Sequence, residues 1–180
     1  MARYGKMTVQ ILSLLSQGML LGFTRDRKQR LEILEECDRT WNSLDRNQLF
    51  RALRILKMKK LVEIIEKGDK RKIELTHFGK LRSKNYLIYN LAVKKRKRWD
   101  GKWRIVIFDV PETRKKTRDS LRGHLKRLGF YEFQKSVFAI PYPCEDEITI
   151  LTNLLDLKDS VRYLESTLSY EEDLKKQFYL

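Results

Sequence analysis

Cysteine and histidine are scarce in this chain of 180 residues, with two of each. Cys37 and Cys144 lie far apart, and neither has a neighbouring cysteine or histidine at a metal-ligand spacing. The sequence therefore indicates neither a disulfide framework nor a zinc site, and we expect both thiols to be buried as small apolar side chains. His77 has no carboxylate beside it, and His124 lies between leucines in a basic segment, so neither receives a catalytic role.

The chain also lacks a long apolar run. No segment approaches the roughly 20 residues that cross a bilayer, and the first ten residues do not have the charged, apolar and small-residue pattern of a signal peptide. The sequence therefore predicts a cytoplasmic protein. Its length suits one ordinary domain or two small domains, each with a core of its own.

Acidic residues are few in the first part of the chain. Residues 1–100 hold 25 Lys or Arg against 11 Asp or Glu, whereas residues 101–180 hold 14 against 13, and the net charge is +15. This uneven distribution predicts that the first part binds a polyanion.

Hydrophobic periodicity predicts three short amphipathic helices, at residues 8–17, 27–37 and 45–59. The second helix aligns Leu31, Leu34 and Cys37 on one side. The third helix buries Leu49, Leu53 and Leu56, and its opposite side is polar and basic. The side chains on that opposite side are Asn47, Arg51, Arg54 and Met58.

A hairpin is predicted next, from strands at residues 61–66 and 71–75 around a turn that contains Gly68 and Asp69. Its tip is cationic, with Lys67, Lys70, Arg71 and Lys72. Thr76 is a suitable N-cap for a fourth helix. This order predicts a winged helix-turn-helix over residues 1–93, whose third helix enters the major groove and whose wing follows the phosphates. The alternative is that Arg51 and Arg54 form an ordinary solvated helix face.

Residues 94–100 form a basic junction, with Lys94, Lys95, Arg96, Lys97 and Arg98 in succession. Such a run repels itself and belongs in solvent or on phosphate. Two interpretations stay open: contact with DNA that releases counterions, or a linker that only improves solubility.

Residues 101–180 predict a second domain. Residues 103–110 are a nearly continuous apolar strand that ends beside Asp109, and Thr113 caps a helix that runs to Leu128 with Gly129 after it. Two short strands, a helix at 147–157 and a strand at 160–164 complete the order βαββαβ, a ferredoxin-like unit. The predicted fold class is α+β. We expect the aromatic tail after residue 164 to dock on its own domain or on a partner chain.

Two motifs in this region carry a family resemblance, FDVP at residues 108–111 and QKSVF at residues 134–138. Residues 101–165 resemble the small ferredoxin-fold endonucleases of CRISPR spacer acquisition, the CRISPR-associated protein two family. The whole-chain architecture resembles PaaX-type transcriptional repressors of phenylacetate catabolism, in which a winged helix precedes such a domain. The further C-terminal domain of those repressors is not expected within these 180 residues.

The two resemblances give Asp109 different roles. The endonuclease resemblance implies that Asp109 is catalytic, paired with its twin across a two-fold axis to hold Mg²⁺ or Mn²⁺. One carboxylate per chain is too little for such an ion unless a dimer supplies the second. The alternative is structural, with the Asp109 carboxylate bonded to amides of the following Val-Pro-Glu turn.

The second domain also offers candidate DNA contacts. They are Arg114, Lys115 and Arg118 on the basic helix, and Gln134, Lys135 and Ser136 in the QKSVF motif. The leading hypothesis is a homodimeric double-stranded-DNA-binding regulator without a cofactor. The alternative hypothesis is a DNA endonuclease dependent on Mg²⁺ or Mn²⁺.

Overall fold

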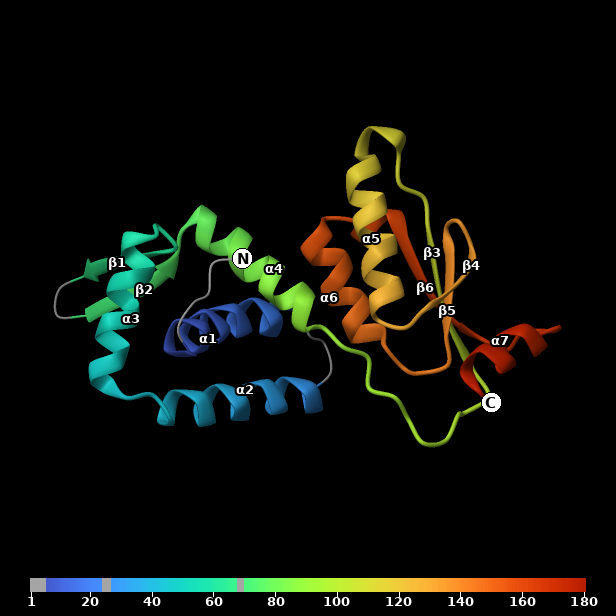
Figure 1. Cartoon of the computed structure of the whole chain (residues 1–180), viewed down its shortest axis with the longest axis horizontal. Helices are drawn as coiled ribbons and strands as arrows, with labels where there is room; N and C mark the ends of the chain where they lie inside the picture. The colour runs from blue at the N-terminus through green and yellow to red at the C-terminus, as the bar shows by residue number, and fades with distance from the viewer. Residues whose placement is uncertain (1–5, 24–26, 68–69) are drawn as a thin grey trace. The chain divides into compact units, whose positions relative to one another are not determined.

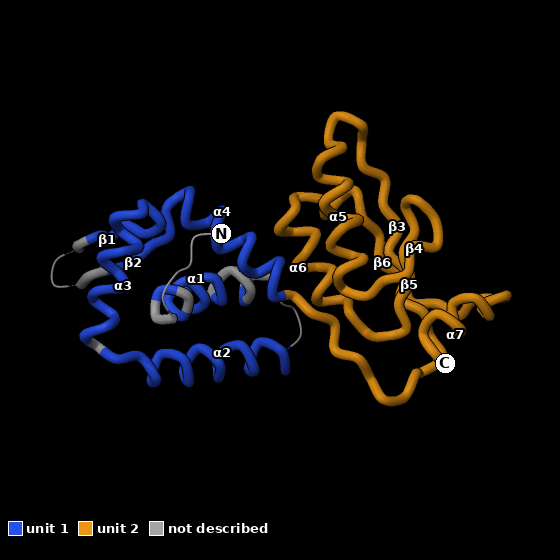
Figure 2. Tube along the Cα trace, viewed as in Figure 1, with its two compact units in different colours: residues 1–90 blue, residues 91–180 orange. Residues whose placement is uncertain are grey.

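The computed structural model describes the backbone of residues 6–23, 27–67 and 70–180. The chain divides into two compact units, residues 1–90 and residues 91–180 (Figure 2). Each unit has its own core and is described by itself.

The first unit consists of helices and one hairpin, in the order expected from the sequence (Figure 1). Its elements are α1 (Lys6–Phe23), α2 (Arg27–Asn42), α3 (Arg46–Met58), β1 (Val62–Lys67), β2 (Lys70–Leu75) and α4 (His77–Asn90). The two strands pair in antiparallel register, from Val62 opposite Leu75 to Lys67 opposite Lys70. The core gathers apolar side chains of α1, α3 and β1, namely Ile11, Leu12, Ala52, Leu53, Leu56, Leu61 and Val62.

The second helix corrects one expectation. α2 buries none of its residues, and the side chains of Leu31 and Leu34 are exposed rather than turned to a core. Cys37, the third residue of the expected apolar side, is partly buried instead, and its thiol donates a hydrogen bond to Gln17 Oε1 of α1 at 2.9 Å. Burial raises the pKa of that thiol, although Cys37 is only partly buried.

The start of α4 is set by Thr76 and by a glycine. Thr76 Oγ1 accepts a hydrogen bond from the Gly79 amide at 3.0 Å, which confirms the expected cap, and donates one to Lys60 O at 2.5 Å. A Cβ at Gly79 would lie 1.9 Å from the Leu61 carbonyl oxygen. Only glycine allows α4 to approach the chain before β1 this closely.

The second unit is a four-stranded antiparallel sheet with helices on both sides. Its elements are β3 (Trp103–Phe108), the short 3-10 helix η1 (Glu112–Arg114), α5 (Lys115–Arg127), β4 (Tyr131–Gln134), β5 (Val137–Ile140), α6 (Glu145–Leu155), η2 (Lys158–Ser160), β6 (Val161–Ser166) and α7 (Glu172–Phe178). The strand order is β4-β5-β3-β6. Figure 1 shows α5 and α6 on one side of the sheet and α7 on the other. This is the expected βαββαβ order with one added helix.

The start of α5 differs from the expectation that Thr113 caps it. The chain first makes the 3-10 turn η1, in which the Arg114 amide donates to Pro111 O at 2.9 Å, and α5 begins only after Arg114, with no side-chain cap. Pro111 fixes the backbone dihedral that starts this turn, and α5 begins one residue later than a cap at Thr113 would give. The expected apolar stripe holds, because Leu121, Leu125 and Leu128 are all buried.

The C-terminal helix docks on its own domain, one of the two outcomes expected for the tail. Leu174 of α7 is buried in a cluster with Trp103, Ile105 and Ala139 of the sheet. The Trp103 indole donates a hydrogen bond to Glu171 Oε2 at 2.5 Å, and its ring centroid lies 5.8 Å from that of Phe178. α7 therefore covers the end of the sheet face nearest Trp103.

Candidate nucleic-acid interface

The helix α3 separates an apolar side from a cationic side. Asp45 caps it by accepting a hydrogen bond from the Gln48 amide at 2.9 Å. The inner side places Ala52, Leu53 and Leu56 in the core. The outer side exposes the four side chains expected there, Asn47, Arg51, Arg54 and Met58.

No acidic residue interrupts α3, whose sequence is RNQLFRALRILKM. Arg51 and Arg54 form no ion pair with any residue that the structure describes. Sequence reasoning placed the cationic stripe correctly but missed Phe50, an exposed aromatic side chain on the same helix. Its position three residues after Asn47 is the signal that points to it.

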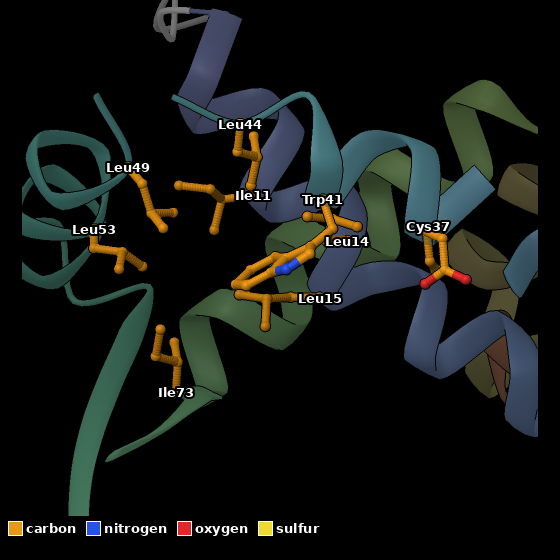
Figure 3. A pocket seen from close by; sticks show the side chains of 10 residues that line it. Ile11, Leu14, Leu15, Cys37, Trp41, Leu44, Leu49, Leu53 and Ile73 are labelled. Carbon is orange, nitrogen blue, oxygen red and sulfur yellow. The ribbon is translucent and has the colours of Figure 1, made fainter. Parts of the chain in front are cut away.

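An apolar pocket of about 330 Å³ lies on the inner side of α3. Figure 3 shows Leu49 and Leu53 of α3 at one side of it, with the Trp41 ring reaching in from α2. The pocket exists because α2 leaves the space beside the α3 core residues unfilled. Trp41 lines this pocket and is exposed.

The hairpin tip is described only in part. Residues 68 and 69 and the side chains of Lys67, Lys70 and Arg71 lie outside the described part of the structure. Lys72 is described and exposed, and its ammonium pairs with Glu74 Oε1 at 2.6 Å. That pairing raises the pKa of Lys72 and lowers the pKa of Glu74.

The basic junction has no regular secondary structure. The five side chains Lys94, Lys95, Arg96, Lys97 and Arg98 are all exposed. A run of like charges stays in water unless a polyanion neutralises it. The junction is therefore accessible to phosphate groups without any rearrangement of a core.

The candidate contacts on α5 are already engaged with oxygen atoms of the same unit. Arg114 donates to Asp156 O at 2.8 Å, and Arg118 lies 2.8 Å from Glu112 Oε2. Lys115 lies 3.6 Å from the other oxygen of Glu112, and these two cations lower the pKa of Glu112. A phosphate at this helix must compete with these partners, so α5 is a weaker candidate surface than α3.

The QKSVF candidates lie at the turn between β4 and β5. Gln134 is the last residue of β4, while Lys135 and Ser136 form the turn. The Ser136 carbonyl oxygen accepts a hydrogen bond from the Phe108 amide at 3.0 Å, which ties this turn to the end of β3. Gln134 and Lys135 are exposed.

Asp109 lies just past β3, at a pocket of about 540 Å³ that also contains Asp159 and Arg162. Its amide donates to Ser160 O at 2.9 Å. The Asp109 side chain forms no hydrogen bond with any described residue, so the structure gives no support to the alternative in which its carboxylate bonds amides of the following turn. Pro111 has no amide hydrogen to offer, which removes one of the donors that such a bond needs.

The Asp109 pocket contains two carboxylates of one chain, those of Asp109 and Asp159. Among the described residues, no three His, Cys, Asp or Glu side chains gather where they can hold a metal. The Arg162 guanidinium, moreover, places a positive charge in the same pocket. A divalent ion here would need a further ligand from a second copy of the chain.

Residues 96–178 match the family model described as the PaaX protein central Cas2-like domain. This segment is therefore similar to the central domain of PaaX proteins and to the CRISPR-associated protein two family, the resemblances expected from the sequence. No curated protein matches the chain.

A solved structure, the uncharacterized protein Rv0674 from Mycobacterium tuberculosis, is 18% identical, with a TM-score of 0.34. The match covers 93% of this chain and 64% of that one, so this chain spans less than two thirds of its length. None of the helices in the described residues has the length and apolar character to span a membrane.

Proposed function

We propose that this protein is a DNA-binding regulator of the PaaX type that acts as a homodimer. The observation that carries the proposal is the acid-free, outward-facing cationic side of α3, in the same chain as a PaaX-type domain. The winged helix-turn-helix occupies residues 1–93, the basic linker residues 94–100 and the ferredoxin-like dimerisation domain residues 101–180.

The order of elements in the first unit supports a winged helix. Three helices precede a two-stranded hairpin, and α3 immediately precedes that hairpin. In this fold the helix before the wing enters the major groove, and the wing lies along the backbone. α3 is 13 residues long and capped at Asp45, so it is a well-formed helix that can enter the major groove.

The chemistry of α3 and the junction fits duplex DNA. Arginine donates two hydrogen bonds to the edge of guanine, and asparagine does so to adenine, whereas lysines and arginines on phosphates supply affinity without sequence preference. Arg51, Arg54 and Asn47 suit the first task, and residues 94–98 suit the second.

The second unit supports the homodimer. Ile107 of β3 and Leu164 of β6 lie on the sheet face opposite α5 and α6, beyond the part that α7 covers, and are 38% and 47% exposed. Two apolar side chains on a partly open sheet face are suited to burial against a second copy. A dimer would also bring two copies of α3 to one DNA site.

The experiment that tests this function is a binding titration with two duplexes, a preferred site selected from random DNA and a scrambled site. Arg51→Ala and Arg54→Ala should each weaken binding to the preferred site by about 1–3 kcal/mol and affect the scrambled site less. Arg39→Ala on α2 is a matched control, because Arg39 is exposed and lies on another helix. Equal binding by all three variants contradicts the proposal.

The endonuclease alternative has no comparable support, because no three side chains that could hold a metal gather among the described residues and a second copy would have to complete the site. Incubation with supercoiled plasmid and Mg²⁺ or Mn²⁺ should leave the plasmid intact, and Asp109→Ala should retain DNA binding. Metal-dependent nicking that Asp109→Ala abolishes would support the nuclease instead.

A further inference from the structure

The exposed aromatic ring of Phe50 needs an explanation. Phe50 is 68% exposed, although Leu53 and Leu56 of the same helix are buried in the core. Leaving a phenylalanine ring in water forgoes the free energy that its burial supplies. An aromatic side chain in this position is therefore available for a contact with a partner.

The neighbours of Phe50 define where that contact falls. Phe50 follows Asn47 by three residues and precedes Arg54 by four, and side chains at these spacings lie side by side on a helix surface. The ring therefore borders the polar stripe that we propose reads base edges. It also lies in the first half of α3, the half of a recognition helix that contacts bases.

The charge of α3 selects an anionic partner. The helix has no acidic residue, and Arg51 and Arg54 lie beside the ring without an ion pair among the described residues. A second copy that used the same face would bring like charges together. A strongly anionic surface that also presents an apolar group satisfies both the arginines and the ring.

Duplex DNA presents one such apolar group in its major groove, the C5 methyl of thymine. We propose that Phe50 contacts a thymine methyl group and so makes the protein prefer thymine at that position of its site. This inference rests on the proposed DNA-binding function and names a residue that determines the sequence read.

The test uses the full chain and its selected duplex site, with each thymine replaced in turn by uracil. This replacement removes the methyl group and leaves every hydrogen-bonding group of the base in place. Wild type should bind about fourfold more weakly when the contacted thymine becomes uracil, the loss that corresponds to one buried methyl group. Phe50→Ala should bind the thymine and uracil duplexes equally.

Two variants serve as controls. Phe78→Ala removes a phenylalanine of similar exposure, 66%, from α4, and it should keep the wild-type preference for thymine. Phe50→Leu keeps an apolar side chain and should retain part of the preference. Thermal unfolding of each variant should match wild type, because the Phe50 and Phe78 rings are exposed and lie outside the core.

The outcomes distinguish a failure of the Phe50 proposal from a failure of the proposed DNA-binding function. DNA binding without any dependence on thymine methyls, or a full thymine preference in Phe50→Ala, overturns the role of Phe50 and leaves DNA binding standing. Equal weakening on both duplexes by Phe50→Ala also overturns it and places the ring on the sugar-phosphate backbone. Failure of wild type to bind any duplex at low salt overturns the proposed function itself.

Discussion

At the scale of single residues, the central strand of the second unit holds a buried positive charge. Arg104 is 3% exposed, and its guanidinium donates to Asp100 Oδ1 and Oδ2 at 2.7 and 2.6 Å, to Glu165 Oε1 at 3.2 Å and to Pro141 O at 3.1 Å. A buried charge is tolerated when its donors are all satisfied. The strand accepts this arginine because residues before and after it in the chain provide the acceptors.

Arg104→Met should lower the free energy of unfolding by roughly 1.5–3 kcal/mol, because hydrogen bonds to charged groups are lost and two carboxylates are left close together. Arg162→Met on the neighbouring strand β6 is the matched control, since Arg162 is exposed and should change stability by less than about 0.5 kcal/mol. Urea denaturation of both variants measures the difference. Equal stability of the two would contradict this account of Arg104.

The same contact predicts a dependence on pH. The hydrogen bonds from Arg104 hold the pKa of Asp100 far below its usual value of about 3.9. The folded state therefore binds fewer protons than the unfolded state, so the stabilisation is present above about pH 4 and is lost as the pH falls below it. Arg104→Met should show a shallower loss of stability below pH 4 than wild type. Parallel curves would rule out this coupling.

At the scale of elements, Gly79 allows α4 to pack closely against the Leu61 carbonyl oxygen. Gly79→Ala forces α4 away from the Leu61 carbonyl and should lower the free energy of unfolding by about 2 kcal/mol or more. Gly123→Ala is the matched control, because Gly123 lies within α5 with no atom near an added Cβ. It should instead raise stability by about 0.5–1 kcal/mol, the usual advantage of alanine in a helix. Thermal unfolding distinguishes the two substitutions.

The helices show which sequence signals were sufficient to predict the structure. The stripe of Leu121, Leu125 and Leu128 predicted α5 well, because its period matches a helix that packs on a sheet. The same kind of period misplaced Leu31 and Leu34, since periodicity identifies an apolar side but not whether another element covers it. The cap at Thr76 was predictable from local chemistry, whereas the 3-10 turn after Pro111 depends on geometry that spacing alone does not reveal.

Only part of the candidate site, likewise, was predictable from the sequence. The outer side of α3 follows from helical spacing, so Arg51 and Arg54 were placed correctly as exposed. The partners of Arg114, Lys115 and Arg118 were not foreseen. Asp156 comes from a distant part of the chain, and Glu112, although close in sequence, received no partner in the prediction. The ion pair between Arg114 and Asp156 is tertiary, and such a pair leaves no signal in a local pattern.

At the scale of the whole molecule, the proposed dimer makes a direct prediction. Leu164→Glu places a charge on the exposed part of the sheet face and should shift the protein from dimer to monomer, because the charge would be buried without a partner. Leu31→Glu on α2 changes another exposed leucine and should leave the dimer intact. Light scattering at micromolar concentration measures both, and a monomeric wild type would exclude the dimer.

The central claim, that this cationic chain binds duplex DNA, is tested most directly by the salt dependence of its affinity. Fluorescence anisotropy with a labelled duplex should show log K falling steeply as log salt rises, with a slope of about 0.9 for each phosphate contact. Replacing Lys94, Lys95, Arg96, Lys97 and Arg98 with neutral residues should reduce that slope and weaken binding to all sequences alike. A flat salt response in wild type, or no binding at low salt, would contradict the claim.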